Sequence, residues 1–293
     1  MKKILIIANP YSGRKKGEKI LKNIINVFSN TPYDIINTTH QNHPYEIAQT
    51  MTVEDYFGVC IIGGDGTMHE VINGMLNRVD QKQLPIGLIP GGTGNSFMHD
   101  MNCLDPINAA KQIVKFNTRA IDVIKITTNE KIYFSFNVCG WGMPPDINIL
   151  AEKMRWLGPQ RYNIASLIEI MKFKKRQCSL LMNDEGIIDD YSFVLCCNTI
   201  HTGKGMKIAP KAKIDDGFID VVAVKKTNRL KLFSLFPKIF SGSHINDPIV
   251  NYHQVKSISI EPDINSSLII DGEILGQTPC GMEVLSNKIE VFN

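Results

Sequence analysis

The first 120 or so residues alternate short, wholly apolar runs with segments in which apolar residues recur at three- and four-residue intervals. Strand-length apolar runs occur at 4–8, 33–39, 59–64 and 84–90. Helical spacing of apolar residues occurs at 20–28, 44–51, 68–76 and 106–116. Because apolar runs without polar alternation are typical of parallel strands buried on both faces, the pattern predicts an α/β domain with a parallel sheet.

The pattern changes near Asp122. Strand-like segments then follow one another at 121–127, 131–140, 177–183, 191–198, 218–224, 254–262, 267–271 and 288–292. Helical patterns occur only near 147–173 and 228–240. Successive strands without intervening helices favour an antiparallel sheet or sandwich, so we predict a second, β-rich domain and place the boundary near Asp122.

Composition places the chain among ordinary globular proteins: 293 residues, 43% hydrophobic and 21% charged, with a net charge of +3. Such a mild charge gives no reason to expect a nucleic-acid partner. The seven cysteines form no C-x-x-C pair, which indicates free thiols in a reducing compartment. The apolar start is too short for a signal peptide, and no run approaches the roughly 18 residues of a membrane span. We therefore expect a cytoplasmic protein.

Glycine-rich turns follow three of the predicted parallel strands: NPYSG (9–13), GGDGT (63–67) and PGGTGN (90–95). Ligands of parallel sheets bind outside the carboxyl ends of the strands. Glycines let a ligand approach the backbone closely, and the N–H groups at a helix start bind anions such as phosphate. The alternative is that these segments are tight turns only.

Asp65 lies between the glycines of the second turn. A carboxylate beside phosphate needs a reason, and phosphoryl transfer supplies two: coordination of Mg²⁺, or acceptance of a proton from an attacking hydroxyl. The alternative is that Asp65 caps the following helix. Other nucleotide-binding motifs are missing, since Gly13–Gly17 lacks P-loop spacing and no H-R-D, D-F-G or G-x-G-x-x-G motif occurs.

The order and spacing of NPYSG, GGDGTMHEVINGM and PGGTGN resemble the diacylglycerol kinase catalytic family, which includes sphingosine, ceramide and bacterial lipid kinases. The resemblance continues through GWGMPPDINILAEKMRWLGPQRY, TGKGMKIAPKAKIDDGFIDVVAV and IDGE. It implies an α/β nucleotide-binding domain over 1–122 and a β-rich, antiparallel sandwich-like lipid-binding domain over 123–276, with strands at about 277–293 returning to the first domain.

The resemblance also implies roles for particular residues. Nucleotide-binding roles fall on Asn9, Thr38, Gly63, Gly64, Gly66, Thr67, Glu70, Thr93, Arg155 and Arg161. Catalytic roles fall on Asp65, Asp271 and Glu273, and we favour Asp271 as the general base, with Asp65 essential in either case. Asp216 matches a metal-binding loop, although an Asp-Gly turn between strands explains it equally well.

Substrate contacts are implied for Asp146 and Asn148. The sphingosine branch of the family carries an acidic residue where this chain has Asn148, and a neutral amide pairs poorly with an ammonium group. The lipid therefore stays open among diacylglycerol, ceramide and a sphingoid base. The segment 228–240 mixes apolar and basic residues, so it predicts either a helix at a membrane interface or one packed on the sheet.

These expectations describe an ATP- and Mg²⁺-dependent lipid kinase, a transferase of lipid metabolism and phospholipid biosynthesis that meets its substrate at a membrane surface. An NAD kinase shares the GGDG turn and is the first alternative. A catalytically inactive lipid- or nucleotide-binding module is the second. The sequence does not predict an oligomeric state.

Overall fold

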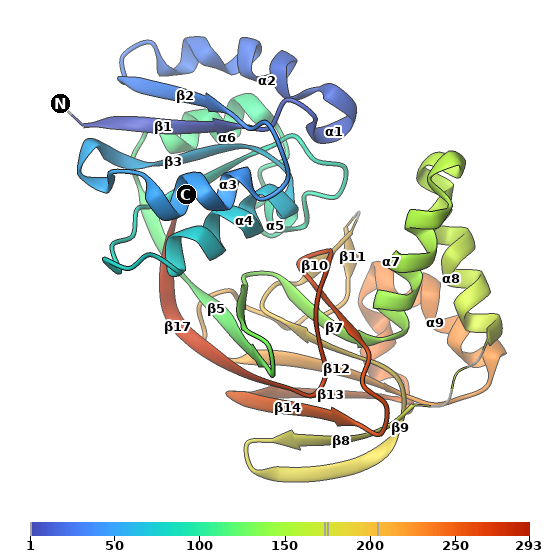
Figure 1. The fold of residues 1–293 in the computed structure, drawn as a ribbon. Helices are drawn as coiled ribbons and strands as arrows, with labels where there is room; N and C mark the ends of the chain where they lie inside the picture. Colours follow the sequence, from blue (N-terminus) through green and yellow to red (C-terminus); the bar gives the residue numbers. More distant parts are fainter. Residues whose placement is uncertain (1, 173, 175, 204) are drawn as a thin grey trace. The chain divides into compact units, whose positions relative to one another are not determined.

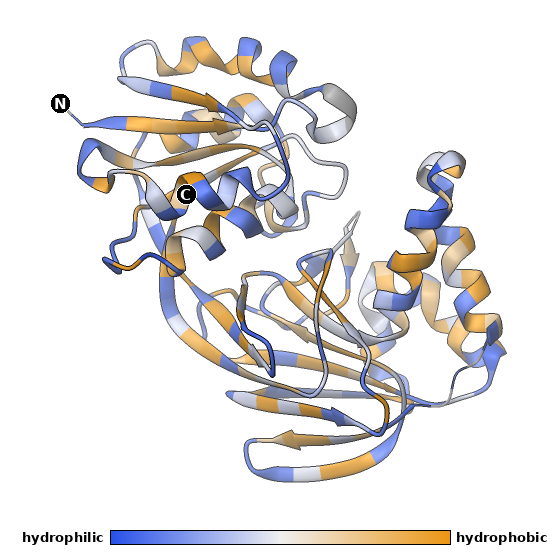
Figure 2. Cartoon of the chain, in the orientation of Figure 1, coloured by the Kyte–Doolittle hydropathy of each residue, from blue (hydrophilic) through white to orange (hydrophobic). Residues whose placement is uncertain are grey.

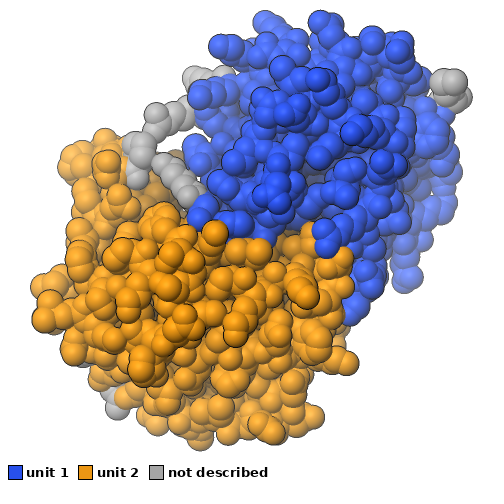
Figure 3. Space-filling view, turned by 180° about the vertical axis from the view of Figure 1, so that it is seen from behind, with its two compact units in different colours: residues 1–123, 201–205, 286–293 blue, residues 124–200, 206–285 orange. Residues whose placement is uncertain are grey.

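The computed structural model of the chain describes residues 2–172, 174, 176–203 and 205–293 (Figure 1). The described chain forms two compact units, which Figure 3 shows in different colours. The first comprises Met1–Val123, His201–Gly205 and Ser286–Asn293, and the second comprises Ile124–Ile200 and Met206–Leu285. The chain thus re-enters the first unit twice, once through a five-residue segment and once at its C-terminus.

The first unit is built on a parallel sheet of order β4-β3-β1-β2. Its strands are β1 (Lys3–Ala8), β2 (Tyr33–Asn37), β3 (Tyr56–Gly63) and β4 (Ile86–Pro90). The end of β17 (Cys280–Phe292) joins the sheet next to β4, with Val291 opposite Ile86. The central strands β1 and β3 are buried along most of their length, as expected for strands covered on both faces.

Helices cover this sheet. They are α1 (Ser12–Lys15), α2 (Gly17–Ile24), η1 (Ile25–Phe28), α3 (His43–Thr50), η2 (Val53–Asp55), α4 (Asp65–Leu76), α5 (Ser96–Asp100) and α6 (Pro106–Ile113). α2 and α6 pack against each other and against the sheet, and α3 packs against α4, which lies on β3. Pro106 begins α6, and the Asp105 carboxylate accepts the Asn108 N–H as its N-cap.

The second unit is a largely antiparallel assembly of strands. They are β5 (Thr118–Thr128, which starts in the first unit), β6 (Ile132–Ser135), β7 (Val138–Gly142), β8 (Gln177–Met182), β9 (Glu185–Cys197), β12 (Ile219–Lys225), β13 (Val250–Val255), β14 (Ser257–Pro262), β15 (Ser267–Ile270) and β16 (Glu273–Gln277). The long β9 pairs with β8 at one end and with β7 and β12 at the other. The predicted fold class, a parallel α/β domain with a β-rich sandwich-like domain, is confirmed.

Short elements complete the chain: β10 (His201–Thr202), β11 (Met206–Lys207), α7 (Met143–Lys153), η3 (Arg155–Gln160), α8 (Arg161–Lys172), α9 (Arg229–Ser241) and η4 (Ser243–Asn246). The single helical pattern predicted near 147–173 is in fact two helices and a 3-10 segment. The chain turns at Gly158, whose φ is +58°, a value that breaks helical geometry. No helix among the described residues is both long and apolar enough to cross a membrane.

All seven cysteines are buried and unpaired. Burial raises the pKa of the Cys178 and Cys280 thiols to about 12. The cysteines therefore behave as small apolar core residues, since it is the thiolate that carries the reactivity of cysteine.

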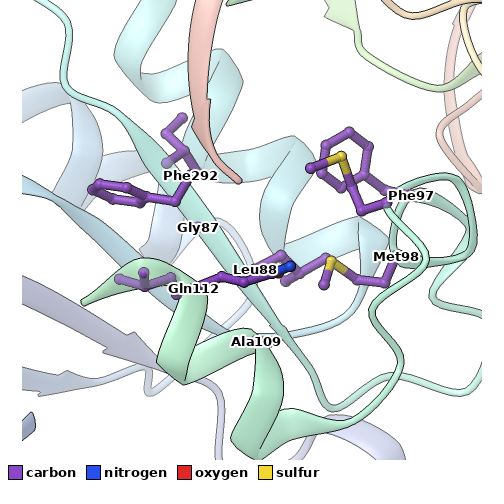
Figure 4. Close-up of a pocket in the computed structure, with 10 residues that line it drawn as sticks. Gly87, Leu88, Phe97, Met98, Ala109, Gln112 and Phe292 are labelled. Carbon is purple, nitrogen blue, oxygen red and sulfur yellow. The ribbon is translucent and has the colours of Figure 1, made fainter. Parts of the chain in front are cut away.

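A small cavity lies in the first unit, between β4 and the helices α5 and α6 (Figure 4). Its volume is about 10 Å³, and Leu88, Phe97, Met98 and Phe292 are among its lining residues. Such a volume holds about one water molecule and no organic ligand. This cavity therefore offers no room for a substrate or a nucleotide.

Candidate functional site

The three glycine-rich turns come together because they follow three neighbouring strands, β1, β3 and β4. Backbone hydrogen bonds extend from the sheet into the turns. The Asn9 N–H donates to Ile62 O at 2.9 Å, and the N–H groups of Gly91 and Gly92 both donate to Gly63 O, at 2.6 and 3.1 Å. The turns therefore form one continuous group, which we call the glycine edge (residues 9–13, 63–67 and 90–95).

Glycine is required where these turns touch. A Cβ on Gly92 would lie 2.7 Å from the Gly64 Cα, and one on Gly64 would lie 3.0 Å from the Gly92 Cα. Gly13, with φ at +54°, would direct a Cβ into the carbonyl oxygen of Gly91. The glycines thus let three backbone segments approach one another closely at this edge.

Asp65 is the first residue of α4, and it bonds to another element. Its Oδ2 accepts the Ser96 N–H at 2.8 Å, and its Oδ1 accepts the Phe97 N–H at 3.2 Å. One carboxylate therefore holds the start of α5 against the start of α4. The sequence alternative was that Asp65 caps the following helix, α4. The N–H groups that its carboxylate accepts here belong instead to α5.

The other predicted residues of the first unit lie around the same turns. The Asn9 Nδ2 donates to Thr67 Oγ1 at 3.3 Å, which ties the first turn to α4. Thr38 is buried just beyond β2, where its N–H donates to Ala8 O, and Thr93 is exposed in the third turn. Glu70 is half-buried on α4.

α4 begins at Asp65, and its N-cap residue, Gly64, provides no side-chain cap. Because the first N–H groups of a helix lack helical partners, such an end carries partial positive charge. The glycine edge therefore combines close backbone approach with an uncapped helix start, which suits an anion such as phosphate.

Asp271 lies in the second unit and is almost fully buried. Its Oδ1 accepts the Ser135 hydroxyl at 2.6 Å and the N–H groups of Asn137 and Val138, each at 3.0 Å. Its Oδ2 accepts the Phe136 N–H at 3.3 Å. The side chain thus binds the whole bend between β6 and β7, and this explains why the strand predicted over 131–140 is two strands.

Removing this carboxylate should destabilise the second unit. In Asp271→Ala, three buried N–H groups and one hydroxyl lose their acceptor, and an unsatisfied buried polar group costs about 1–3 kcal/mol. We expect the free energy of unfolding to fall by about 3 kcal/mol or more, measured by urea denaturation. Glu261→Ala, at an exposed acid of β14, is the control, and equal stability of the two variants would contradict the structural role.

Glu273 follows two residues later, and its surroundings differ from those of the buried Asp271. It is exposed at the start of β16, and no hydrogen bond or ion pair of its carboxylate occurs within the described part of the chain. Between the two acids lies Gly272, whose carbonyl accepts the Asn148 Nδ2 at 2.8 Å. Asn148 on α7 therefore fixes the turn that presents Glu273, and it does so by donating a hydrogen bond that an aspartate could not donate.

The charged side chains of α7, η3 and α8 that were predicted to bind phosphate or substrate already form ion pairs within the structure. Arg155 and Arg161 both bind Glu152, Arg155 through Nε at 2.6 Å and Arg161 through a terminal nitrogen at 2.9 Å. Asp146 Oδ2 accepts the Lys174 Nζ at 2.6 Å and also contacts the Arg176 guanidinium. The structure thus brings Arg155 and Arg161 together on one carboxylate, and it neutralises Asp146 with two cations.

The metal expected at Asp216 has no complete side-chain site. Asp216 Oδ1 accepts the Phe218 N–H at 3.1 Å, as in an Asp-Gly turn. Within the described ranges, no group of three or more His, Cys, Asp or Glu side chains could hold a metal ion. A cation at Asp216 would therefore depend on backbone carbonyls and water for most of its ligands.

Asp220 lies four residues after Asp216 and is fully buried in β12. Its Oδ1 accepts the Tyr252 hydroxyl at 2.5 Å, whereas its Oδ2 has no hydrogen-bond partner among the described residues. Burial raises the pKa of Asp220 to about 6, and the nearby charge of Asp216 adds to the rise, although the Tyr252 hydrogen bond opposes it.

This raised pKa predicts a pH dependence of stability. The folded protein binds the Asp220 proton more tightly than the unfolded chain does, so the free energy of unfolding should fall as pH rises between about 4 and 6. The loss is at most about 3 kcal/mol at 1.36 kcal/mol per pKa unit. Asp220→Asn should lack this loss when urea denaturation is compared at pH 4, 6 and 8. Parallel curves for the two proteins would contradict the assignment.

Sequence reasoning missed two parts of the arrangement. One is Ser135, whose hydroxyl shares Asp271 with the backbone. The other is the segment 201–205 of the first unit: His201 donates its N–H to Asp100 Oδ2 at 3.1 Å, and Gly203 O accepts the Ser96 hydroxyl at 3.3 Å. This segment therefore supports both ends of α5. In the sequence, the two glycines of TGKG (202–205) were the only local sign of this segment.

Comparison with known proteins agrees with this architecture. Residues 3–126 match the family described as the diacylglycerol kinase catalytic domain, and residues 137–293 match the YegS C-terminal NAD kinase beta sandwich-like domain. Sphingosine kinase 1 of Arabidopsis thaliana is 29% identical over 94% of this chain and 69% of its own length. A diacylglycerol kinase of Mycobacterium tuberculosis is 27% identical over 99% of this chain and 94% of its own length.

The fold is also found in a solved structure. The crystal structure of a diacylglycerol kinase from Bacillus anthracis superposes with a TM-score of 0.83, covers 99% of this chain and 96% of the other, and shares 24% identity. The matches to the family models and to the curated kinases confirm the resemblance expected from the glycine-rich motifs.

Proposed function

The chain belongs to the lipid kinase family that joins a diacylglycerol kinase catalytic domain to a YegS-type C-terminal domain, and from this premise we propose that it transfers the γ-phosphoryl group of ATP to a lipid hydroxyl. The observation that carries the proposal is the glycine edge, where three glycine-rich turns meet beside the uncapped start of α4. Phosphoryl transfer depends mainly on positioning and on stabilising charge, and this edge suits both.

Binding of the nucleotide falls to the first unit in this proposal. The backbone of the turns, together with Asn9, Thr38, Thr67 and Glu70, would contact the nucleotide. Arg155 and Arg161 would have to release Glu152 before either could bind phosphate. Magnesium, if it binds with the nucleotide, would take most of its ligands from the phosphates and water and would offset the negative charge of the transferred group.

Glu273 is the better candidate for the general base. A base must offer a lone pair to the substrate hydroxyl, and the Asp271 oxygens already accept four hydrogen bonds in the interior. Glu273 is exposed beside Asp271, on the turn that Asn148 holds. We therefore assign proton acceptance to Glu273 and give Asp271 a positioning role, which revises the sequence-based preference for Asp271.

The acceptor headgroup is proposed to be uncharged. The relatives include kinases named for sphingosine and for diacylglycerol, and only the sphingoid base carries an ammonium group. A bound ammonium needs an anionic partner, but Asp146 already binds two cations and Asn148 is neutral. A neutral acceptor such as diacylglycerol or ceramide fits this surface better.

The test offers γ-labelled ATP with Mg²⁺ to the full chain, together with diacylglycerol, ceramide, sphingosine or NAD. We expect label in a neutral lipid. Label only in NAD would support the NAD kinase alternative, and label in no acceptor, with ATP or lipid still bound, would support an inactive binding module. Label predominantly in sphingosine would overturn the neutral-headgroup assignment while leaving the lipid kinase proposal intact.

A further inference from the structure

The helix α9 has two apolar faces, and the chain uses only one of them. Leu232 and Leu235 are buried, and Ile239 packs on the same core cluster, which also contains residues of β9, β12 and β13. Their spacing of three and four residues places them on one side of the helix. This side accounts for the sequence alternative in which segment 228–240 packs on the sheet.

The opposite side of α9 is apolar and exposed. Leu230 is 84% exposed, Phe233 is 54% exposed and Phe240 is 49% exposed, and Pro237 is exposed as well. Spacings of three, four and three residues align these four side chains along the helix, and we call them the outer face of α9. Figure 2 shows hydrophobic colouring along this helix. Single exposed apolar residues are ordinary, but an aligned set of large ones indicates a binding surface.

Basic residues flank the outer face, and α9 contains no acid. By helical geometry, Arg229 lies next to Phe233 on one flank, and Lys231 and Lys238 lie on the other. Lys231 and Lys238 both donate to Asp247 Oδ2, at 2.8 and 3.1 Å, and both ammonium groups remain partly exposed. An apolar stripe between cationic flanks is the pattern of helices that lie in a membrane interface.

We propose that the outer face of α9 docks on an anionic lipid surface. Leu230, Phe233 and Phe240 would enter the boundary between headgroups and acyl chains, while the basic flanks bind lipid phosphates. The exposed lysine and arginine stems suit this depth because their apolar parts can cover the acyl boundary with the charge kept in water. The docking proposal depends on the proposed function in one respect only: a membrane surface of this kind would present the lipid acceptor to the kinase.

A second copy of the chain is a poorer occupant. One helix face offers much less than the roughly 800 Å² per partner that stable interfaces bury. Two such faces would also bring like-charged flanks together, which disfavours pairing. An anionic lipid surface complements both parts of the face, since acyl chains suit the apolar stripe and phosphates suit the basic flanks.

The first experiment is vesicle binding, without ATP. The full chain and the variant L230S/F233S/F240S are sedimented with vesicles of phosphatidylglycerol and phosphatidylcholine, or of phosphatidylcholine alone. We expect at least 10-fold weaker partition of the variant to anionic vesicles, and weaker partition of the wild type to neutral ones. The control I188S/I264S removes apolar side chains that are 71% and 82% exposed elsewhere in the second unit, and should bind like wild type.

Equal binding of all three proteins would overturn the proposal. A change of oligomeric state in the triple variant, seen by analytical ultracentrifugation, with unchanged vesicle binding would assign the face to a second copy instead. A further comparison separates docking from chemistry: the triple variant should turn over a short-chain acceptor in detergent micelles at the wild-type rate and the same acceptor in vesicles at least 10-fold more slowly. If no acceptor is phosphorylated by any protein, the proposed function fails, and vesicle binding still decides the docking surface.

Discussion

Asp65→Asn should lower the rate of phosphoryl transfer by at least about 100-fold in a protein that still folds. Each oxygen of this carboxylate accepts one backbone N–H of α5. Asparagine keeps one accepting oxygen and turns an NH₂ group toward the other N–H, so the start of α5 must move away from α4. The glycine edge then loses both its geometry and the negative charge of Asp65. The proposed site needs both for phosphoryl transfer. Steady-state kinetics with the identified lipid acceptor measure the loss.

Asp105→Asn is a matched control for this variant. Asp105 also accepts a backbone N–H at a helix start, that of Asn108 in α6. Because asparagine caps helices about as well as aspartate, this variant should keep wild-type turnover and stability. Thermal unfolding of both variants shows whether Asp65→Asn remains folded. Wild-type turnover in a folded Asp65→Asn would remove the glycine edge from the proposed mechanism.

Glu273→Gln should lower kcat by about 100- to 10,000-fold and leave the KM for ATP nearly unchanged. Glutamine preserves the shape of the side chain but cannot accept a proton from the substrate hydroxyl. The acidic limb of the pH–rate profile should disappear with it. Because Glu273 is exposed and its carboxylate makes no hydrogen bond or ion pair with any residue that the structure describes, the free energy of unfolding should not change.

Glu261→Gln supplies the control, since Glu261 is an exposed acid on β14 of the same unit. It should behave as wild type in every measurement. The contrast with Asp271 is equally informative: Asp271→Ala should lose stability, whereas Glu273→Gln should lose turnover alone. A Glu273→Gln enzyme with wild-type kcat would return the base role to Asp271 or Asp65.

The glycine edge was predictable because its determinants are local. Each turn combines glycines with the end of an apolar run, and the rule that parallel strands bring their carboxyl ends to one edge places the turns together. The break at Gly158 was also within reach, since Gly158-Pro159 is a breaker signal in the sequence.

The surroundings of Asp271 were not predictable in this way. Its hydrogen-bond partners Ser135 and Val138 lie more than 130 residues earlier in the chain, and FSFNV reads as an uninterrupted strand. Only the tertiary structure shows that one side chain bends this strand. The same limit applies to Asn148, whose bond to Gly272 joins a helix to a turn over a separation of 124 residues.

Because every cysteine is buried, the rate at which a reagent labels each thiol reports how often the surrounding unit opens. Cys60 and Cys103 belong to the first unit, and Cys139, Cys178, Cys196, Cys197 and Cys280 belong to the second. A maleimide or other alkylating reagent should leave the native protein unlabelled and reach each thiol only when the surrounding segment transiently exposes it. Mass spectrometry of the labelled peptides would then give separate opening rates for the two units, with no engineered probe.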